Sequence, residues 1–264
     1  MNMKLEEIRK YWNEAGKQFP TVGSMTPTSR DPFLSQLEEE YIISSLEKDY
    51  LVLEIGCGDA SHSVKYAKKV KKLSGVDVAE SLIGIAKERA DHEGIKNIDF
   101  TVASVLDMEK IYRSKKFNCV ISQRCLINLP KWQHQKVVIL QIYNLLQKDG
   151  LFLLTEGFQE GINNLNIIRN KFCLTPIKTV NYNRNMIRKE FELFISQYFD
   201  IIERSHYGFY LFLSRIFHPL AVLPNEPKHD SKLNMIAMEI SRNIKIPDFE
   251  RFSYVMSYIL RKKG

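Results

Sequence analysis

The central part of the chain alternates short apolar runs with longer amphipathic segments. Five-residue apolar runs favour strands buried in a parallel sheet, whereas the segments between them have the three-to-four-residue spacing of helices. The predicted strands cover 51–55, 73–78, 98–102, 117–122 and 151–155. The predicted helices between them cover 60–72, 80–93 and 131–147. Strands that alternate with helices in this way predict an α/β fold with a doubly wound, mostly parallel sheet.

Helical patterns also flank this alternating region. Leu5, Ile8 and Trp12 recur at helical spacing, and Asp31 followed by Pro32 marks the start of a second helix. After residue 156 we expect helices at 160–173, 185–197 and 231–244, and strands near 201 and at 252–263. The sequence therefore predicts seven strands, a helical N-terminal segment over 1–49 and helical insertions within 157–264.

Composition and charge narrow the picture further. The 264 residues, 44% of them hydrophobic, suit a domain with a sizeable core. The net charge of +7 allows an anionic partner, but the lysines are scattered apart from "KKVKK" and "RKKG", which disfavours nucleic acid. No uncharged run approaches the ~20 residues of a membrane span, and no apolar leader is visible, so we expect a cytoplasmic protein.

The four cysteines do not form a recognisable metal or redox motif. No pair has the CxxC spacing, and Cys57, Cys119, Cys125 and Cys173 are far apart in the sequence. We therefore expect reduced thiols, a reducing compartment and no metal site.

The stretch "LVLEIGCGDASHS" raises a chemical question, because Glu54 ends an otherwise apolar strand. Carboxylates are seldom buried without a partner. Gly56 and Gly58 turn the strand into the next helix and allow a ligand to approach the backbone. Asp77 ends the second strand, 21 residues after Gly56, where an acid can bind a ribose diol. These residues predict a nucleoside site.

The same stretch indicates which nucleoside is bound. The dinucleotide fingerprint G-x-G-x-x-G is broken at Ser61, and the carboxylate of Glu54 would repel phosphates. S-adenosylmethionine has no phosphate and carries an ammonium and a sulfonium. Residues 50–156 resemble the class I S-adenosylmethionine-dependent methyltransferases, whose first motif has this acid followed by G-x-G. A phosphate-binding Rossmann domain is the alternative.

The resemblance implies roles for particular segments. A Rossmann-like core over 50–156 would bind S-adenosylmethionine under an N-terminal helical lid at 1–49, and 157–264 would add acceptor-pocket helices and the closing strands of the same domain. Relatives often have an acid where Ser104 stands, so either Ser104 or Asp107 is expected to meet the adenine. The expected cofactor-binding residues are Glu54, Gly56, Cys57, Gly58, Asp77, Val78, Ser104, Val105, Gln123 and Arg30. Within the lid, Thr28 and Arg30 lie near a helix start, and Arg30 is the candidate for the methionine carboxylate.

The end of the fourth strand, "SQRCLINLP", bears on the methyl acceptor. It lacks the N/D-P-P-Y motif and the cysteine after proline that DNA-base methyltransferases use. Arg124 is interpreted as a ligand for a carboxylate or phosphate, or as the ion-pair partner of Glu156. His206 and Glu156 are the candidate bases beside Arg124 in the predicted catalytic set. Further candidates for polar contacts are Asn166, Arg169, Asn183, Tyr207, Tyr210 and Arg215.

The sequence as a whole predicts S-adenosylmethionine-dependent methyl transfer to a hydroxyl or an amine of a small molecule. The positive charge and the arginines favour an anionic acceptor, such as a sugar phosphate, a nucleotide sugar or another precursor of a polysaccharide or secondary metabolite. An RNA-modifying methyltransferase and a non-catalytic S-adenosylmethionine-binding protein are the alternatives. The sequence does not indicate an oligomeric state.

Overall fold

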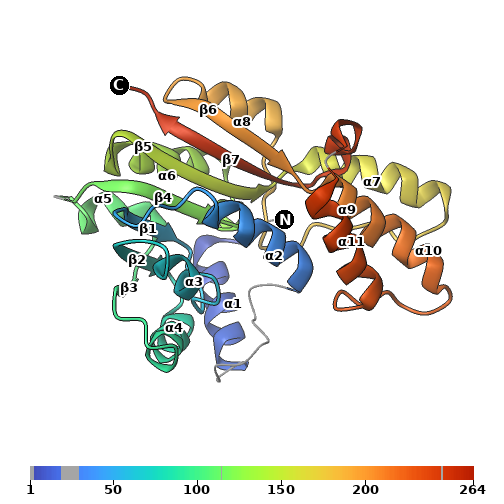
Figure 1. Cartoon of the computed structure of the whole chain (residues 1–264), viewed down its shortest axis with the longest axis horizontal. Coiled ribbons are helices and arrows are strands. Elements are labelled where there is room, and N and C mark those ends of the chain that lie inside the picture. Colours follow the sequence, from blue (N-terminus) through green and yellow to red (C-terminus); the bar gives the residue numbers. More distant parts are fainter. Residues whose placement is uncertain (1–2, 19–29, 114, 245) are drawn as a thin grey trace.

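The computed structural model describes residues 3–18, 30–113, 115–244 and 246–264 (Figure 1). Its seven-stranded sheet has the order β3-β2-β1-β4-β5-β7-β6. Strands β1 to β5 pair in parallel, and β7 runs antiparallel to both of its neighbours. The strands are β1 Leu51–Ile55, β2 Lys72–Asp77, β3 Ile98–Val102, β4 Phe117–Gln123, β5 Leu146–Gly157, β6 Phe199–His206 and β7 Val255–Lys262. The predicted seven-stranded, mostly parallel α/β sheet is confirmed.

The helices predicted at 80–93, 131–147 and 231–244 are present, and the largest difference from the prediction lies between residues 208 and 222. The aromatic segment after β6 forms α9, a π-helical turn at 213–217 and α10, which the sequence pattern did not predict as helices. The helices are α1 Leu5–Gln18, α2 Pro32–Ile43, α3 Ser63–Ala67, α4 Glu80–His92, α5 Met108–Ile111, α6 Trp132–Leu145, α7 Gln159–Lys171, α8 Arg188–Ile195, α9 Gly208–Phe212, α10 His218–Val222 and α11 Lys232–Asn243. None of the helices described is long and apolar enough to cross a bilayer.

Two predicted boundaries were wrong for physical reasons. The helix expected at 60–72 is only the short α3, because the chain first needs several residues to leave the glycine loop. The strand expected at 151–155 begins already at Leu146, because the "KDG" residues continue the strand in place of a separate turn. This strand also ends two residues later than predicted, at Gly157.

Strand β1 lies at the centre of the sheet and is covered on both faces. Leu53 and Ile55 belong to the apolar cluster that contains residues of α6 and α8, whereas Val52 belongs to the cluster that contains Tyr66 of α3. In the parallel register Ile55 pairs with Val76 of β2 and with Ser122 of β4. The carboxyl ends of β1, β2 and β4 therefore meet at one edge of the sheet, the usual place for a ligand site in such folds.

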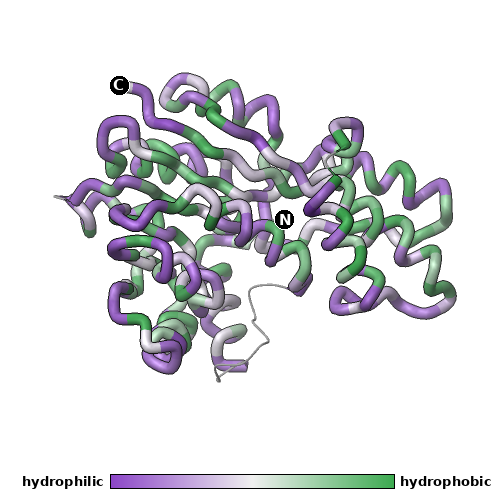
Figure 2. The backbone as a smooth tube through the Cα atoms, in the orientation of Figure 1, coloured by the Kyte–Doolittle hydropathy of each residue, from purple (hydrophilic) through white to green (hydrophobic). Residues whose placement is uncertain are grey.

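The N-terminal and C-terminal helices approach this edge. Helix α1 packs against α4, where the hydroxyl of Ser81 donates to the carbonyl of Asn13 at 2.8 Å. Helix α2 shares an apolar cluster with α7, α9 and α11 through Leu34 and Leu37. In Figure 1 helices α7, α9, α10 and α11 gather at one end of the sheet, and in Figure 2 they alternate hydrophobic and hydrophilic stretches as amphipathic helices do. Thr28, in the segment expected to act as a lid, lies outside the described residues.

Two glycines offer a matched test of how the C-terminal helices are held on the sheet. A Cβ at Gly161 of α7 would lie 2.3 Å from backbone atoms of Ser253 and Tyr254, whereas a Cβ at Gly84 of α4 would have no neighbour within 4 Å. We predict that Gly161→Ala lowers the free energy of unfolding by about 1–3 kcal/mol through overpacking. Gly84→Ala should raise it by about 0.5–1 kcal/mol, because alanine has the higher helix propensity. Urea denaturation measures both, and an unaffected Gly161→Ala would contradict this close packing.

Candidate active site

A cavity of about 470 Å³ lies at the carboxyl edge of the sheet, between the strand ends and helices α1 and α2. All ten predicted cofactor-binding residues line it, from Arg30 in the N-terminal segment to Gln123 at the end of β4. Arg124 lines it as well. His206 and Glu156 are not among the described residues that line the cavity. The structure thus brings together the expected cofactor residues and separates them from the two expected bases.

The glycine loop after β1 has a backbone shape that requires glycine. Gly56 and Gly58 have φ values of 67° and 54°, in the left-handed region that suits glycine. A Cβ on Gly56 would also lie 2.5 Å from the sulfur of Cys125. The amide of Gly58 donates to Oδ2 of Asp77 at 3.0 Å, so the loop is tied to the end of β2.

Asp77 is held by backbone donors at the mouth of the loop. Its Oδ1 accepts from the amide of Ala79 at 2.8 Å, in addition to the bond from Gly58. Burial raises the pKa of this carboxyl, and the backbone hydrogen bonds oppose part of that shift. The carboxylate is fixed in place and retains lone pairs toward the cavity, which suits it to accept hydrogen bonds from a diol.

Glu54 is the unusual acid of the site. The residue is 3% exposed, and its Oε2 has no hydrogen-bond partner among the described residues. Burial raises the pKa of Glu54 to about 7, against the effects of the Ser63 hydroxyl and of His62. A buried carboxylate oxygen without a donor is costly. Its position on the cavity wall makes it a ready acceptor for a cationic N–H group.

The ends of β3 and β4 complete this half of the cavity. Ser104 caps the 3₁₀ turn Val105–Asp107 by accepting from the amide of Leu106 at 3.2 Å, and it lines the cavity. Asp107, the alternative to Ser104, pairs with Lys110 at 2.6 Å and is not among the described lining residues. Of the two, Ser104 is therefore the residue placed to meet a ligand.

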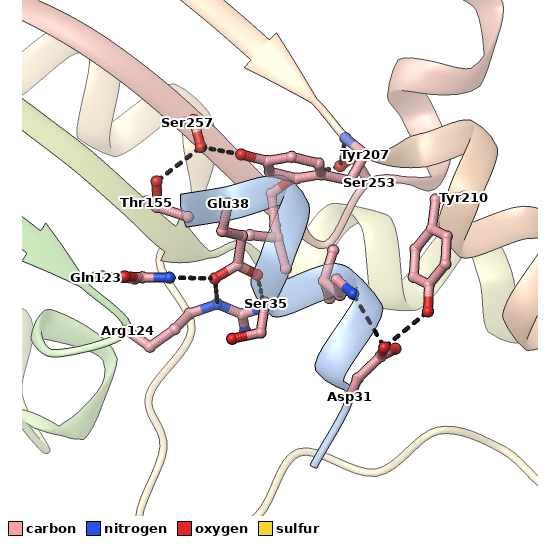
Figure 3. Close-up of polar contacts among 12 residues, drawn as sticks. Asp31, Ser35, Glu38, Gln123, Arg124, Thr155, Tyr207, Tyr210, Ser253 and Ser257 are labelled. Atoms are coloured by element: carbon pink, nitrogen blue, oxygen red, sulfur yellow. Dashed lines mark hydrogen bonds and ion pairs between the residues drawn. The ribbon is translucent and has the colours of Figure 1, made fainter. Parts of the chain in front are cut away.

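Arg124 forms its ion pair with Glu38 of α2. The Nη2 atom of Arg124 lies 2.5 Å from Oε1 of Glu38, and its Nε lies 3.3 Å from Oε2 (Figure 3). Gln123 donates to the same carboxylate at 3.2 Å. Of the two interpretations of Arg124, the ion pair with Glu156 was wrong, because Arg124 pairs with the Glu38 carboxylate of α2, 86 positions away in the sequence.

The Glu156 carboxylate binds the backbone of the loop that follows β4. Its carboxylate accepts from the Ser122 hydroxyl at 2.7 Å and from three successive amides, those of Cys125, Leu126 and Ile127, at 2.9, 2.7 and 3.3 Å. Burial raises the pKa of Glu156 to about 7. With both oxygens bonded and no surface on the cavity, Glu156 is placed to hold the turn, and the structure does not put it within reach of a substrate.

The remaining candidates fall into two groups. Asn183 and Arg215 line the cavity. His206 ends β6, where it pairs with Met256 of β7 and its Nδ1 accepts from the amide of Gly208 at 3.4 Å. The other candidates bond to Ile177 (Asn166), Thr175 (Arg169), Ser257 (Tyr207) and the α2 N-cap Asp31 (Tyr210).

A second ion pair joins α2 to the C-terminal helices. Asp31 accepts from the Tyr210 hydroxyl at 2.7 Å (Figure 3). It also accepts from Arg215 at 2.5 Å, and both partners come from the segment after β6. Burial opposes ionisation of Asp31, but Arg215 and these hydrogen bonds bring its pKa below the usual value. The Nη1 atom of Arg215 is buried and has no hydrogen-bond partner among the described residues. His229 also lines this part of the cavity.

Sequence reasoning missed the polar face of α2. Asp31, Ser35 and Glu38 all line the cavity, at spacings of four and then three residues. That spacing places them on one side of a helix that also carries apolar residues. A polar stripe of this kind was visible in "DPFLSQLEEEYII" and could have indicated that α2 faces a site. His62, just after the glycine loop, was missed as well.

No metal centre is found in the part of the chain that the structure describes. Within residues 3–18, 30–113, 115–244 and 246–264, no group of three or more His, Cys, Asp or Glu side chains is arranged to hold a metal ion.

Comparison with known proteins identifies a family that the chain matches. A family model described as a methyltransferase domain matches residues 46–201. The ubiquinone biosynthesis O-methyltransferase of Coxiella burnetii is 28% identical over 136 residues, which cover 49% of this chain and 53% of that protein. The chain spans about half the length of the curated relatives it matches.

Solved structures show the same fold. Magnesium protoporphyrin IX methyltransferase of Synechocystis PCC 6803, with bound S-adenosylhomocysteine, is 13% identical, with a TM-score of 0.61 over 98% of this chain and all of that one. Phosphoethanolamine N-methyltransferase 1 of Haemonchus contortus, in complex with phosphoethanolamine and S-adenosylhomocysteine, is 14% identical, with a TM-score of 0.62 over 98% of this chain and 50% of that one.

The pairing of Arg124 with Glu38 can be measured directly. Because Glu38 is buried, we predict a coupling energy of about 1–3 kcal/mol in a double-mutant cycle of Arg124→Ala and Glu38→Ala. The pair of Lys68 and Glu93, 2.8 Å apart but more exposed, is the control and should couple by less than about 1 kcal/mol. Unfolding free energies from urea titration give both values. Equal coupling in the two cycles would contradict a special role for the Arg124 pair in holding α2.

Proposed function

The chain belongs to the methyltransferase domain family and has the fold of class I methyltransferases, and from that premise we propose that it transfers a methyl group from S-adenosylmethionine to a small anionic molecule. The observation that carries the proposal is the cavity in which the glycine loop, Asp77 and the unpartnered oxygen of Glu54 meet. The acceptor group is a hydroxyl or an amine. A cavity of about 470 Å³ is within the usual range of small-molecule sites.

The residues present fit S-adenosylmethionine, which supplies an electrophilic methyl group on a sulfonium when it is bound. The Asp77 carboxylate would accept from the ribose hydroxyls, and the Glu54 oxygen would accept from the ammonium. Arg30, which immediately precedes the N-cap residue of α2, would bind the methionine carboxylate of the cofactor. The side of the cavity that contains Ser104 and Val105 would hold the adenine.

The acceptor half of the cavity is built by α2 and the C-terminal segment. Arg124 uses both Nε and Nη2 to bind Glu38, so it is poorly suited to bind a further anion, whereas Arg215 binds Asp31 through Nη2. Arg215 has a buried Nη1 without a partner among the described residues, and Arg30 also lines the cavity. We therefore propose that the acceptor's carboxylate or phosphate binds at Arg215, since a guanidinium suits such groups, while Arg30 binds the cofactor's carboxylate.

Several details of this proposal extend beyond the family match. Sugar phosphates, nucleotide sugars and other anionic precursors are the candidate acceptors, and one fold neighbour was solved with phosphoethanolamine. An RNA acceptor or a purely ligand-binding role is less consistent with a cavity that carries ionic groups on both sides. A cytoplasmic location and the N-terminal lid stay predictions.

The cofactor site predicts a pH-dependent affinity. Glu54 has a pKa of about 7, and only its ionised form can balance an ammonium, so the affinity for S-adenosylhomocysteine should fall by up to about tenfold from pH 8 to pH 6. Glu54→Gln should weaken binding at pH 8 and flatten this dependence, whereas exposed Glu88→Gln should change neither. Isothermal calorimetry measures the dissociation constants. Tight binding of NAD without a signal for S-adenosylhomocysteine would end the proposal.

The acceptor site predicts a preference among substrates. We expect methyl transfer, followed with radiolabelled S-adenosylmethionine, to phosphorylated or carboxylated hydroxy and amino compounds in preference to their neutral analogues or a generic RNA. Arg215→Lys should raise the KM of the acceptor about tenfold or more while the affinity for S-adenosylhomocysteine stays unchanged, because a point charge replaces the guanidinium fork. Exposed Arg251→Lys is the control. Preference for a neutral acceptor would show that Arg215 serves only Asp31.

A further inference from the structure

A hydrogen-bonded chain leads from the acceptor half of the cavity to a buried carboxylate. We propose that Ser35, His62 and Glu39 form a proton relay in which His62 is the base for a hydroxyl acceptor. The inference rests on the proposed methyl transfer and adds to it the route of the proton and the choice of a hydroxyl over an amine.

Ser35, His62 and Glu39 have the geometry of an activated hydroxyl. Ser35 Oγ lies 2.9 Å from His62 Nε2, and His62 Nδ1 lies 2.7 Å from Glu39 Oε2. Lys65 donates to both oxygens of Glu39, at 3.0 and 2.8 Å. Ser35 and His62 line the cavity. A hydroxyl, a histidine within hydrogen-bond reach and a third group that orients the ring are the arrangement expected of a base and its partner.

The carboxylate fixes the direction of the hydrogen bonds. Burial opposes ionisation of Glu39, but its bonds from His62 and Lys65 bring its pKa below the usual value, so it acts as an acceptor. His62 must then donate from Nδ1, which leaves the lone pair of Nε2 to accept from the Ser35 hydroxyl. The Ser35 oxygen keeps lone pairs for a further O–H group that enters the cavity.

The position of Ser35 on α2 places the relay beside the acceptor. Ser35 lies four residues after Asp31 and three before Glu38, on one face of the helix (Figure 3). Asp31 pairs with Arg215 of the acceptor half, and Glu38 pairs with Arg124 at the end of β4. The hydroxyl of Ser35 is therefore flanked on α2 by the two ion pairs that border the acceptor.

The proton and electron balance of the step is complete with these groups. The acceptor oxygen forms its bond to the methyl carbon as the carbon–sulfur bond breaks, and the electron pair of that bond stays on sulfur. The acceptor's proton passes to Ser35 Oγ while the Ser35 proton passes to His62 Nε2. The imidazolium that results is balanced by the carboxylate of Glu39. A hydroxyl needs such a base because its own acidity is low, whereas a neutral amine can attack without one.

The first test reads the hydrogen positions without needing an acceptor. In full-length protein with ¹⁵N-labelled histidine, saturated with S-adenosylhomocysteine at pH 8, NMR should show the His62 ring protonated at Nδ1 and bare at Nε2. Glu39→Gln should disturb this tautomer. The ring signals that disappear in His62→Gln are those of His62. A proton on Nε2 in the wild-type complex would overturn the relay.

The second test separates proton transfer from binding. It uses the panel of hydroxy and amino compounds assayed for methyl transfer above, and from it the hydroxy compound with the highest turnover. We expect His62→Gln to lower kcat by about 100-fold or more while the dissociation constant of S-adenosylhomocysteine changes by less than about twofold. Ser35→Ala should lower kcat less, since a water can bridge the gap. His92→Gln, exposed at the end of α4, is the matched control. Imidazole should partly restore turnover to His62→Ala.

The outcomes distinguish the relay from the proposed function. Normal kcat in both His62→Gln and Ser35→Ala would overturn the relay and leave methyl transfer intact. Unchanged kcat with weaker binding of S-adenosylhomocysteine would assign the pair to the cofactor and also overturn it. Wild-type protein that binds S-adenosylhomocysteine but labels no compound of the panel would count against the proposed function, and the relay would fall with it.

Discussion

The burial of three carboxylates on one helix determines how this site is assembled. The N-cap residue Asp31 and the α2 residues Glu38 and Glu39 are all buried, and a buried carboxylate is costly unless it is paired and hydrogen-bonded. Each finds its cation or donor in a different part of the chain, namely in the C-terminal helices, at the end of β4, and in the segment from His62 to Lys65. Helix α2 therefore joins the sheet edge, the glycine loop and the C-terminal layer around one cavity.

Such pairs contribute more to arrangement than to stability. Replacing a buried ion pair with apolar residues of similar volume is often neutral or stabilising, whereas removing one partner alone is strongly destabilising. Apolar contacts through Leu34 and Leu37 already join α2 to the C-terminal helices. The polar face is thus better explained by what it places in the cavity: Ser35, flanked by two ion pairs and bonded to His62.

The sequence predicted the features that depend on local patterns. The glycine loop, Glu54 and Asp77 were found because a strand end, a tight turn and a fixed spacing have local signatures. The bonds from Glu38 to Arg124 and from Ser35 to His62 join residues 86 and 27 positions apart, and no local pattern specifies such partners. Helices α9 and α10 were missed because an aromatic-rich run has no clear helical period, whereas α11 was predicted at 231–244. The polar stripe of α2 was visible in the sequence, but a polar helix face is equally typical of a solvent-exposed surface.

Glu54 and Glu156 show why a raised pKa alone does not identify a functional acid. Both are the next-to-last residue of a central strand, both are buried, and burial raises the pKa of each to about 7. The Glu156 carboxylate accepts hydrogen bonds from one hydroxyl and three amides, so its charge already stabilises the turn after β4. Glu54 keeps one oxygen without a partner among the described residues, on the wall of the cavity. The difference lies in the number of donors that the fold supplies, and an acid that lacks one donor can use that oxygen for a ligand.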